Sequence, residues 1–549
     1  MDEKILNKPG LMTGLIVGAL VTAATLAVIF LANAVASLPL IPLDIIDWAA
    51  RNMPGELITF GIDTMVAIIG ALNLGPTSEV AKLGEQMLGV FTLFLAGVIA
   101  SGVLFLVLKR FNERRMVYIG GIAAGLAIGL PMLFINANVP NFEQSNPLVN
   151  AIWIVAVFVA WGLAVAWIYN DLTALKPVDE AAAGAEAQQI DRRQFLVRVG
   201  GATAVLTVAG AGLSVLFNRT SDSTSQTVAS ASNPDPAPTP TTPPSNIADS
   251  NLEPAPGTRP EYTPLEDHYR IDISTRPPNI DSETWVLAVS GLVNNPMNLT
   301  LDDLRAYESQ DQMVTLSCIS NPIAGDLIST TRWTGVSMQK ILETLEPSET
   351  ATHLLIRSAD GFDEVVDLEL IRSDERIMLA YEWDGRPLLQ KHGFPLRIWI
   401  PDHFGMKQPK WITEFEFIDE WQEGYWVRRG WSATALVKTT SVIDTVSVNA
   451  IYEEDGTQYV PIGGIAYSGD RGISRVEVQI DDNDWVEADL RAPLSETTWV
   501  VWRYDWPFEA GSHTFSVRTY EADGTMQVVQ TARSRPDGAS GIHTVRDTV

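Results

Sequence analysis

Hydrophobic and polar positions divide the chain at about residue 218 into two contrasting parts. Five runs in the first part carry no Asp, Glu, Lys or Arg, and each reaches the length of about 20 residues that a helix needs to cross a hydrocarbon core. These runs are 9–43, 88–108, 116–142, 147–170 and 199–218. In water they could instead be buried core helices, but five in succession favour a membrane. The pattern therefore predicts an α-helical transmembrane bundle of about five helices over residues 1–218.

A further apolar segment, 55–74, carries Glu56 and Asp63, and we interpret it as an interfacial or re-entrant helix. Basic residues gather before the first run, between the second and third, and between the fourth and fifth, which places those loops in the cytoplasm. Five crossings then leave everything after about residue 218 on the extracytoplasmic side. If 55–74 crosses as well, that parity fails. The basic residues are Lys4, Lys8, Lys109, Arg110, Arg114, Arg115, Lys176, Arg192, Arg193 and Arg198.

The last apolar run follows the arginine pair Arg192 and Arg193. Two readings stay open: a twin-arginine export signal that acts as an anchor, or an ordinary positive flank. Residues 219–260 are rich in Ser, Thr, Pro and Ala, a composition that cannot form a core and predicts a disordered linker.

After the linker, the pattern over 261–437 predicts an α+β domain. Short helices are expected at 300–307 and 334–345, with Thr300 and Thr334 as their N-caps. The apolar, β-branched runs predict strands. These runs are HLLIRSA (353–359), RIMLAYEW (376–383), PLRIWIP (395–401) and ITEFEFI (412–418).

From 438 to 549 the pattern contains strands alone. The segments 475–481 and 513–519 alternate apolar and polar residues with period two, and turn signals at 481–484 and 522–524 follow them. This spacing predicts an all-β, immunoglobulin-like sandwich.

Composition narrows the function classes. The 549 residues are 46% hydrophobic and carry a net charge of −28, which excludes nucleic acid as a natural partner because phosphate contacts need clustered cations. Cys318 is the single cysteine, so no internal disulfide forms; it is either a buried apolar residue or a reactive or metal-binding thiol. The first histidine is His268, so the predicted spans cannot hold a haem between two imidazoles. The charge-free spans also weaken a transporter reading.

Three separated segments, in order, resemble the sulfite oxidase family of molybdopterin enzymes. They are EDHYRIDISTRPPNIDSETW (266–285), TLSCISNPIAGDLISTTRWTG (315–335) and YEWDGRPLLQKHGFPLRIWIPDHFGMKQPKW (381–411). The stretch GGIAYSGDRGISRVEVQIDD (463–482) is similar to that family's dimerisation domain. The resemblance covers about 261–549 and implies a molybdenum–molybdopterin cofactor, with a homodimer through the C-terminal domain left open.

By this resemblance, Cys318 is the protein ligand of the molybdenum, because a soft thiolate suits that metal. Trp333 resembles a wall of the substrate pocket, and Tyr425 could place its phenol near the metal. For each residue the alternative is structural: a buried thiol, a core aromatic ring or a solvated charge. The residues implied to hold the pterin and its phosphate are Tyr269, Arg270, Asp360, His392, Arg397, Lys407, Gln408 and Lys410, with Gly405 allowing close backbone approach.

The sequence departs from the family where sulfite oxidases hold their dianionic substrate with arginines. After Cys318 the chain has Asn321, Pro322 and Ile323, and the entry segment has Asp272. The missing cations and added carboxylate are expected to repel sulfite, although Arg270 or Arg332 could compensate.

We therefore expect a membrane-anchored, extracytoplasmic oxidoreductase that transfers an oxygen atom to or from a small neutral or weakly charged substrate. A separate electron partner such as a cytochrome is implied, because a single cysteine excludes a CxxCH haem motif. The alternative is a non-catalytic tethered binding or assembly module that retains the fold.

Overall fold

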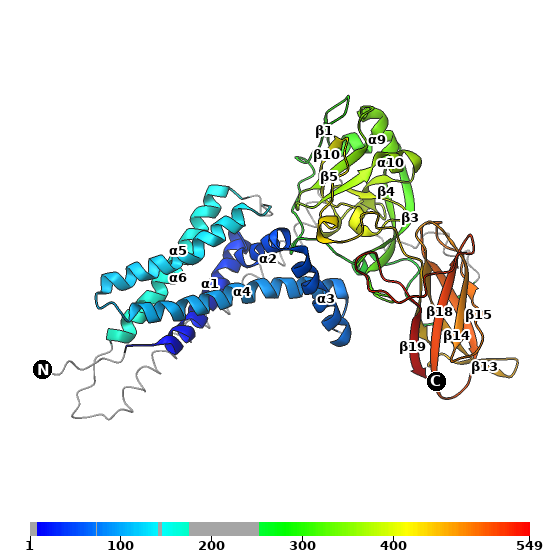
Figure 1. Ribbon diagram of the computed structural model, residues 1–549, viewed down its shortest axis with the longest axis horizontal. Helices are drawn as coiled ribbons and strands as arrows, with labels where there is room; N and C mark the ends of the chain where they lie inside the picture. Colours follow the sequence, from blue (N-terminus) through cyan, green and yellow to red (C-terminus); the bar gives the residue numbers. More distant parts are fainter. Residues whose placement is uncertain (1–7, 73, 141–144, 175–251) are drawn as a thin grey trace, which may run out of the picture. The chain divides into compact units, whose positions relative to one another are not determined.

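The computed structural model describes residues 8–72, 74–140, 145–174 and 252–549 (Figure 1). The described residues form two units, an N-terminal helical unit and a β-rich unit. The fifth predicted span at 199–218, its arginine pair and most of the predicted linker lie outside the described residues.

Four helices of the described chain are long and apolar enough to cross a membrane, which agrees with four of the five predicted spans. Most of the exposed large apolar side chains also lie on the N-terminal helices, as expected of surfaces that face lipid. The four helices are α1 (Leu11–Ala36), α4 (Thr77–Leu108), α5 (Arg114–Ala137) and α6 (Pro147–Ala174) (Figure 1).

The first helix is shorter than the charge-free run that predicted it. Helix α1 ends at Ala36, and α2 (Ile41–Asn52) follows with Pro42 in its first turn. Pro39 and Pro42 separate the two, because proline has no N–H to donate and disfavours helical backbone in the residue before it. Helix α3 (Gly55–Leu72) covers the predicted interfacial segment and is not among the four long apolar helices; whether it crosses stays a prediction.

Small and polar residues join the long helices. A Cβ atom added to Gly162 of α6 would lie 2.0 Å from the carbonyl oxygen of Gly121 on α5, so the two backbones touch. Trp161 Nε1 of α6 donates to Thr22 Oγ1 of α1 at 3.0 Å. Close backbone approach and interhelical hydrogen bonds are the means by which helices associate where the hydrophobic effect is absent.

The β-rich unit begins with one mixed sheet and one antiparallel sheet. In one sheet β1 (Leu287–Gly291) and β10 (Ile412–Ile418) run parallel, and the strand order is β2-β1-β10-β5-β6. The other is antiparallel, with order β3-β4-β7-β8 and β9 paired with β7. The remaining strands are β2 (Asn298–Leu299), β3 (Ser309–Ser317), β4 (Ile328–Ser337), β5 (His353–Ser358), β6 (Asp363–Asp367), β7 (Met378–Trp383), β8 (Arg386–Pro387) and β9 (Arg397–Trp399). The four strands predicted here are all present.

Of the two predicted N-caps of the short helices, one is present in the structure. Helix α8 (Leu301–Arg305) starts at Thr300, whose side chain and that of Asp303 form a reciprocal capping box, as predicted for Thr300. The prediction for Thr334 is wrong. Thr334 lies within β4, and α9 (Met338–Leu345) is capped by Ser337. Pairing of β4 with β3 and β7 extends the strand through the predicted first turn. Helix α10 spans Leu368–Ser373.

The C-terminal part consists of two antiparallel sheets that share one core. One sheet has the order β11-β13-β17-β16 with β12 on β13, and the other β15-β14-β18-β19. Trp502, Val476 and Phe515 bring both sheets into the core. The strands are β11 (Thr440–Val446), β12 (Tyr452–Glu454), β13 (Thr457–Tyr467), β14 (Ile473–Ile480), β15 (Val486–Glu487), β16 (Asp489–Leu490), β17 (Val500–Pro507), β18 (Ser512–Glu521) and β19 (His543–Thr548). The sandwich arrangement agrees with the prediction; its immunoglobulin-like class and the domain boundaries stay predictions.

Strand β3 joins this sandwich to the preceding sheets. Tyr467 Oη donates to the carbonyl oxygen of Thr315 at 2.9 Å. The backbone N–H of Trp499 donates to Thr315 Oγ1 at 3.0 Å. Strand β3 ends at Ser317, directly before Cys318. Contacts from the sandwich therefore fix the position of the strand that precedes the cysteine.

Candidate functional site

Cys318 stands at the end of β3, at the start of the loop that leads to β4. Its backbone N–H donates to the carbonyl oxygen of Leu327 at 2.9 Å, which closes that loop. The thiol is buried, 3.1 Å from Ser320 Oγ, and belongs to an apolar cluster that includes Tyr269 and Trp333. Burial raises the pKa of the Cys318 thiol. The sulfur is therefore protonated at neutral pH unless a metal displaces the proton.

Next to the cysteine, two buried histidines and a tryptophan form a triangle of rings. The ring centre of His268 lies 5.1 Å from that of His392 and 4.8 Å from that of Trp383, and the rings of Trp383 and His392 are 4.9 Å apart. Burial lowers the pKa of His268 to about 3 and also lowers the pKa of His392. Both imidazoles are therefore neutral. His268 Nδ1 donates to the carbonyl oxygen of Tyr269 at 2.9 Å, which leaves its Nε2 as an acceptor.

Arg397 is the cation at the centre of this region. It is 3% exposed, lies 4.2 Å from the ring centre of Trp333, and donates from Nη1 to the carbonyl oxygen of His392 at 3.1 Å. Burial lowers the pKa of Arg397 to about 10. Gly393, with φ +112°, makes room for it: an added Cβ would lie 3.3 Å from Arg397 Cβ and 3.2 Å from Lys410 Cβ. The HGFPLR segment thus places a charged guanidinium inside the protein.

The entry segment adds an ion-paired group of three residues. Asp272 accepts from Arg270 Nε at 2.7 Å and from Lys410 Nζ at 3.1 Å. Lys410 also lies 4.4 Å from the ring centre of Trp411. The expectation that Asp272 acts as a repelling carboxylate therefore needs correction: two cations neutralise it, and the group keeps one net positive charge. Arg332, by contrast, faces Asp384 at 4.0 Å.

Gly405 and Gln408 lie at the base of the same region. A Cβ added to Gly405 would lie 3.2 Å from Tyr269 Oη and 3.6 Å from the carbonyl oxygen of Ser317, so this glycine lets the backbone pass close to both. Gln408 donates from Nε2 to the carbonyl oxygens of Ile400 and His403, at 3.1 and 2.8 Å.

Several buried polar atoms of this cluster have no hydrogen-bond partner in the described chain. A buried polar atom without a partner costs roughly 1–3 kcal/mol, and native proteins keep few of them. Their gathering around a buried cation fits a polar, anionic group such as a pterin with its phosphate, which offers donors, acceptors and negative charge together. The atoms are His268 Nε2, His392 Nε2, Arg397 Nε, Gln408 Oε1, Trp333 Nε1 and Trp383 Nε1.

Three predicted residues lie elsewhere. Lys407 Nζ is bound to Glu364 Oε1 at 2.7 Å, in a buried ion pair with β6. Asp360 accepts from the backbone N–H of Phe362 at 3.0 Å, in the turn between β5 and β6. Tyr425 packs on Phe362 and under the guanidinium of Arg429. The contacts of these three residues join them to the β5–β6 hairpin and its neighbours, and their roles at the cofactor stay predictions.

Sequence reasoning did not assign His268 to the site, although it directly precedes Tyr269. Its burial and its ring contacts with His392 and Trp383 place it there. The signal in the sequence was weak, because a lone histidine beside a tyrosine has no distinctive spacing.

The side chain of Trp333 is fully buried beside Arg397, and its role as a wall of the substrate pocket stays a prediction. A cavity lies beside the loop after Cys318. Its two cationic residues are ion-paired, Arg259 with Asp444 at 2.6 Å and Lys438 with Asp537 at 2.5 Å. The cavity is lined by Arg259, Ser317, Asn321, Pro322, Ile323, Ala324, Gly325, Ile328, Phe404, Val437, Lys438, Thr440, Val442, Ile465, Tyr467 and Ala539.

A mixed α+β fold with a buried cysteine and a buried cationic, polar cradle fits a molybdopterin-binding protein, and comparison with known proteins assigns this class. Residues 274–426 match the family model described as the oxidoreductase molybdopterin binding domain. Mitochondrial sulfite oxidase of Rattus norvegicus is 28% identical over 270 residues, which cover 41% of this chain and 50% of that protein. This chain spans about half the length of the mitochondrial sulfite oxidases that it matches.

The uncharacterized oxidoreductase YuiH of Bacillus subtilis is 30% identical over 151 residues, which cover 28% of this chain and 74% of that protein. Among solved structures, the sulfane dehydrogenase SoxCD of Paracoccus pantotrophus is 18% identical with a TM-score of 0.45, covering 57% of this chain and 93% of that one. The chain belongs to the sulfite oxidase family of molybdopterin-binding oxidoreductases.

If Lys410 binds the phosphate of the cofactor, as the resemblance implies, its charge should make cofactor binding depend on pH. Burial lowers the pKa of Lys410 to about 8, whereas a phosphate monoester is already doubly ionised above about pH 7. A bound anion favours the charged amine, so binding takes up one proton once the pH exceeds about 8. The cofactor affinity should then fall by up to about tenfold per pH unit.

The measurement is the dissociation constant of the cofactor, from release followed between pH 7 and 9.5. Lys410→Arg is the matched control, because a guanidinium stays charged throughout this range and its affinity should not change with pH. Parallel pH profiles for the two proteins would exclude Lys410 as the titrating group.

Proposed function

We propose that this chain is a membrane-anchored, extracytoplasmic molybdenum–molybdopterin oxidoreductase that transfers an oxygen atom to or from a small uncharged substrate. The observation that carries the proposal is the buried Arg397 with its surrounding unpartnered polar atoms, beside the single cysteine. A non-catalytic module would pay the cost of this buried polar cluster without any use for it. When bound, the cofactor supplies a metal that accepts and releases two electrons and an oxygen atom.

The residues of the chain hold and tune that group. Cys318 Sγ would bind the metal as a thiolate, and its proton leaves when the metal arrives. Arg397 and Lys410 would bind the phosphate. The neutral imidazoles of His268 and His392 would offer hydrogen bonds to the ring system, and the surrounding tryptophans exclude water.

We propose that the substrate enters beside the loop after Cys318, through the cavity that Ile323 and Phe404 help to line. The lining includes Pro322, Ile328 and Val442, and both of its cations are ion-paired. Such a wall favours an uncharged molecule such as an S-oxide or N-oxide over a dianion. A dianion would lose its hydration on entering the cavity, and neither ion-paired cation would compensate for that desolvation cost.

The remaining parts of the proposal concern the membrane and the partners. Four long apolar helices support a multi-pass anchor. The basic flanks, taken with the fifth predicted span at 199–218, support a site on the extracytoplasmic side. The C-terminal sandwich is proposed to be immunoglobulin-like and could form a homodimer. Electrons are proposed to come from or go to a separate protein such as a cytochrome.

The test uses the purified full-length protein with its molybdenum content measured. Reduction of an S-oxide or N-oxide takes two electrons and two protons and releases water, so a reduced dye serves as donor; sulfite oxidation is followed with an oxidised dye. We expect a higher kcat/KM for at least one uncharged oxide than for sulfite. If no oxide is turned over by protein with full molybdenum occupancy, the result would favour the non-catalytic module.

An arginine added to the cavity sharpens the test of substrate charge. Ile323 is half-buried in the cavity wall, so a longer side chain can reach solvent. A charge-assisted hydrogen bond contributes about 1.5–3 kcal/mol, so Ile323→Arg should raise kcat/KM for sulfite by about tenfold or more. Ile323→Met is the control for size. An equal response of the two variants would contradict the proposed route.

A further inference from the structure

Residues 401–408, here called the cradle loop, carry three of the residues predicted for the cofactor site, Gly405, Lys407 and Gln408. The loop follows β9 and ends just before Lys410. Gly405 lies against Tyr269 Oη and the carbonyl oxygen of Ser317, and Gln408 turns back onto the carbonyl oxygen of His403. A displacement of this loop would therefore move the floor of the cofactor site.

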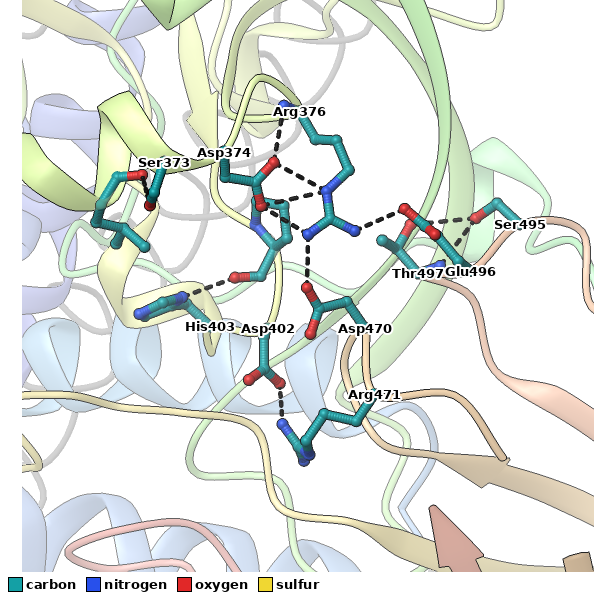
Figure 2. Close-up of polar contacts among 12 residues, drawn as sticks. Ser373, Asp374, Arg376, Asp402, His403, Asp470, Arg471, Ser495, Glu496 and Thr497 are labelled. Carbon is teal, nitrogen blue, oxygen red and sulfur yellow. Dashed lines mark hydrogen bonds and ion pairs between the residues drawn. The ribbon is translucent and has the colours of Figure 1, made fainter. Parts of the chain in front are cut away.

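The C-terminal sandwich reaches this loop through Arg471. Arg471 Nη1 donates to Asp402 Oδ1 (Figure 2), Nε donates to Glu521 Oε1 at 3.0 Å, and Nη2 donates to the carbonyl oxygen of Val437 at 2.8 Å. Val437 N–H in turn donates to the carbonyl oxygen of Asp402 at 2.9 Å. One guanidinium thus holds both Asp402 and the chain segment that pairs with it.

The space around Asp402 is closed. Gly469, with φ +68°, precedes Arg471 by two residues, and a Cβ added there would lie 1.9 Å from Asp402 Oδ1. The backbone of Asp402 itself is left-handed, with φ 57°, a conformation that needs support from its surroundings in a residue with a Cβ. The carboxylate can therefore occupy only a narrow set of positions.

Arg471 is the cation that favours the ionised form of the Asp402 carboxyl group. The pKa of Asp402 is raised to about 6, by burial above all and with smaller contributions from Asp470 and Glu521, while Arg471 acts to lower it. His403, beside it on the loop, has a pKa lowered by burial and adds no stable positive charge. Without Arg471, the carboxylates of Asp402 and Glu521 would lose their shared cation in a partly buried space, with the charge of Asp470 close by.

We propose that Arg471 is a positioning residue for the cofactor site: from the C-terminal sandwich, it fixes the cradle loop through Asp402. The sandwich would then be a structural half of the site as well as an appended domain. This inference rests on the proposed function for the identity of the cofactor, but the loop contacts themselves are independent of it.

A second ion cluster on the same interface supplies a matched control. Arg376 pairs with Asp374 at 2.6 Å, and across the interface with Asp470 at 2.6 Å and Glu496 at 2.7 Å (Figure 2). It lies just before β7, and its ion-pair partners within the described residues, Asp374, Asp470 and Glu496, all lie outside the cradle loop. Both clusters join the same two parts of the chain, so only a specific effect on the loop separates Arg471 from Arg376.

The first measurement is hydrogen exchange in the full-length chain produced without molybdate. The reporters are the amides of Phe404, Lys407 and Gln408, which donate within or next to the loop. Arg471→Met should speed their exchange by about tenfold or more, since it removes charge-assisted hydrogen bonds, whereas Arg376→Met should leave them as in the wild type. This arm does not depend on the cofactor, so it distinguishes failure of the clamp from failure of the proposed function.

The second measurement is cofactor retention in protein produced with molybdate. Loss of an outer supporting contact lowers metal affinity by about 10–100-fold, so Arg471→Met and Asp402→Asn should each lose cofactor by about tenfold or more. The double variant should lose little more than either one, because both substitutions break the same link. Arg471→Lys should restore part of the retention.

Three results would overturn the inference. They are equal effects of Arg376→Met and Arg471→Met on the loop amides, additive losses in the double variant, and wild-type exchange with wild-type retention in Arg471→Met. Each would reduce Arg471 to one more ion pair of the interface.

Discussion

Cys318→Ser is expected to lower turnover by more than about 100-fold while most of the molybdenum remains bound. Loss of an outer contact to a metal ligand already costs about 10–100-fold, and this substitution would remove the proposed ligand sulfur itself. By the proposed function, Arg397, Lys410 and the two histidines would still hold the organic part of the cofactor, so the metal content should fall much less than the activity. The serine is nearly the same size as the buried cysteine, so the fold should persist.

The measurement combines metal analysis with electron paramagnetic resonance of the partly reduced protein. A thiolate ligand changes the Mo(V) signal, so the Cys318→Ser spectrum should differ from that of the wild type. Ser320→Ala is the control, because it removes the hydroxyl 3.1 Å from Cys318 Sγ and keeps the sulfur. Its turnover should fall by about tenfold at most. An unchanged Mo(V) signal at equal metal content would remove Cys318 from the ligand set.

Arg397→Met is expected to have opposite effects on the loaded and the cofactor-free protein. In the loaded protein, the loss of charge-assisted hydrogen bonds of about 1.5–3 kcal/mol each should reduce cofactor affinity by roughly 10–100-fold. In the cofactor-free protein, the buried guanidinium is a cost, as its pKa of about 10 indicates. Replacing a buried charge by an apolar residue of similar volume is often neutral or stabilising, so the free energy of unfolding should stay equal or rise.

Molybdenum content and urea unfolding of the chain with and without cofactor separate these effects. Arg357→Met is the matched control, since Arg357 pairs with Glu414 and Glu416 on a more exposed surface and such pairs contribute about 1 kcal/mol or less. A full complement of molybdenum in Arg397→Met would show that the cofactor's anion binds elsewhere. A marked loss of stability in the cofactor-free variant would instead make Arg397 a structural residue.

Local patterns were sufficient for most of the elements. Alternation with period two located β14 and β18, and apolar β-branched runs located β5, β7, β9 and β10, because these signals arise from neighbours in the sequence. The prediction failed at Thr334, where long-range pairing extended β4 over a segment whose local signal favoured a helix start. It also placed the end of the first span too late, although Pro39 and Pro42 marked the break.

For the candidate site, too, the motifs revealed some residues correctly and left the placement of others undetermined. Cys318, His392, Arg397, Gln408 and Lys410 lie in motifs, and the structure brings them together with Tyr269 from the entry segment. Lys407 lies in the same motif but turns to Glu364 on β6, because side chains of adjacent residues in a short turn point in different directions. No spacing rule reveals that choice.

The sequence by itself determined the two-part organisation, the apolar helices, the family and the lone sulfur, because hydrophobic periodicity and short motifs are properties of consecutive residues. Only the tertiary structure decided that Asp272 is neutralised by Arg270 and Lys410, that His268 joins the site, that Trp333 is sealed under Arg397, and that Arg471 reaches Asp402. Each of these facts depends on which distant segments meet and on what water they exclude, and burial and charge pairing exist only once the chain has folded.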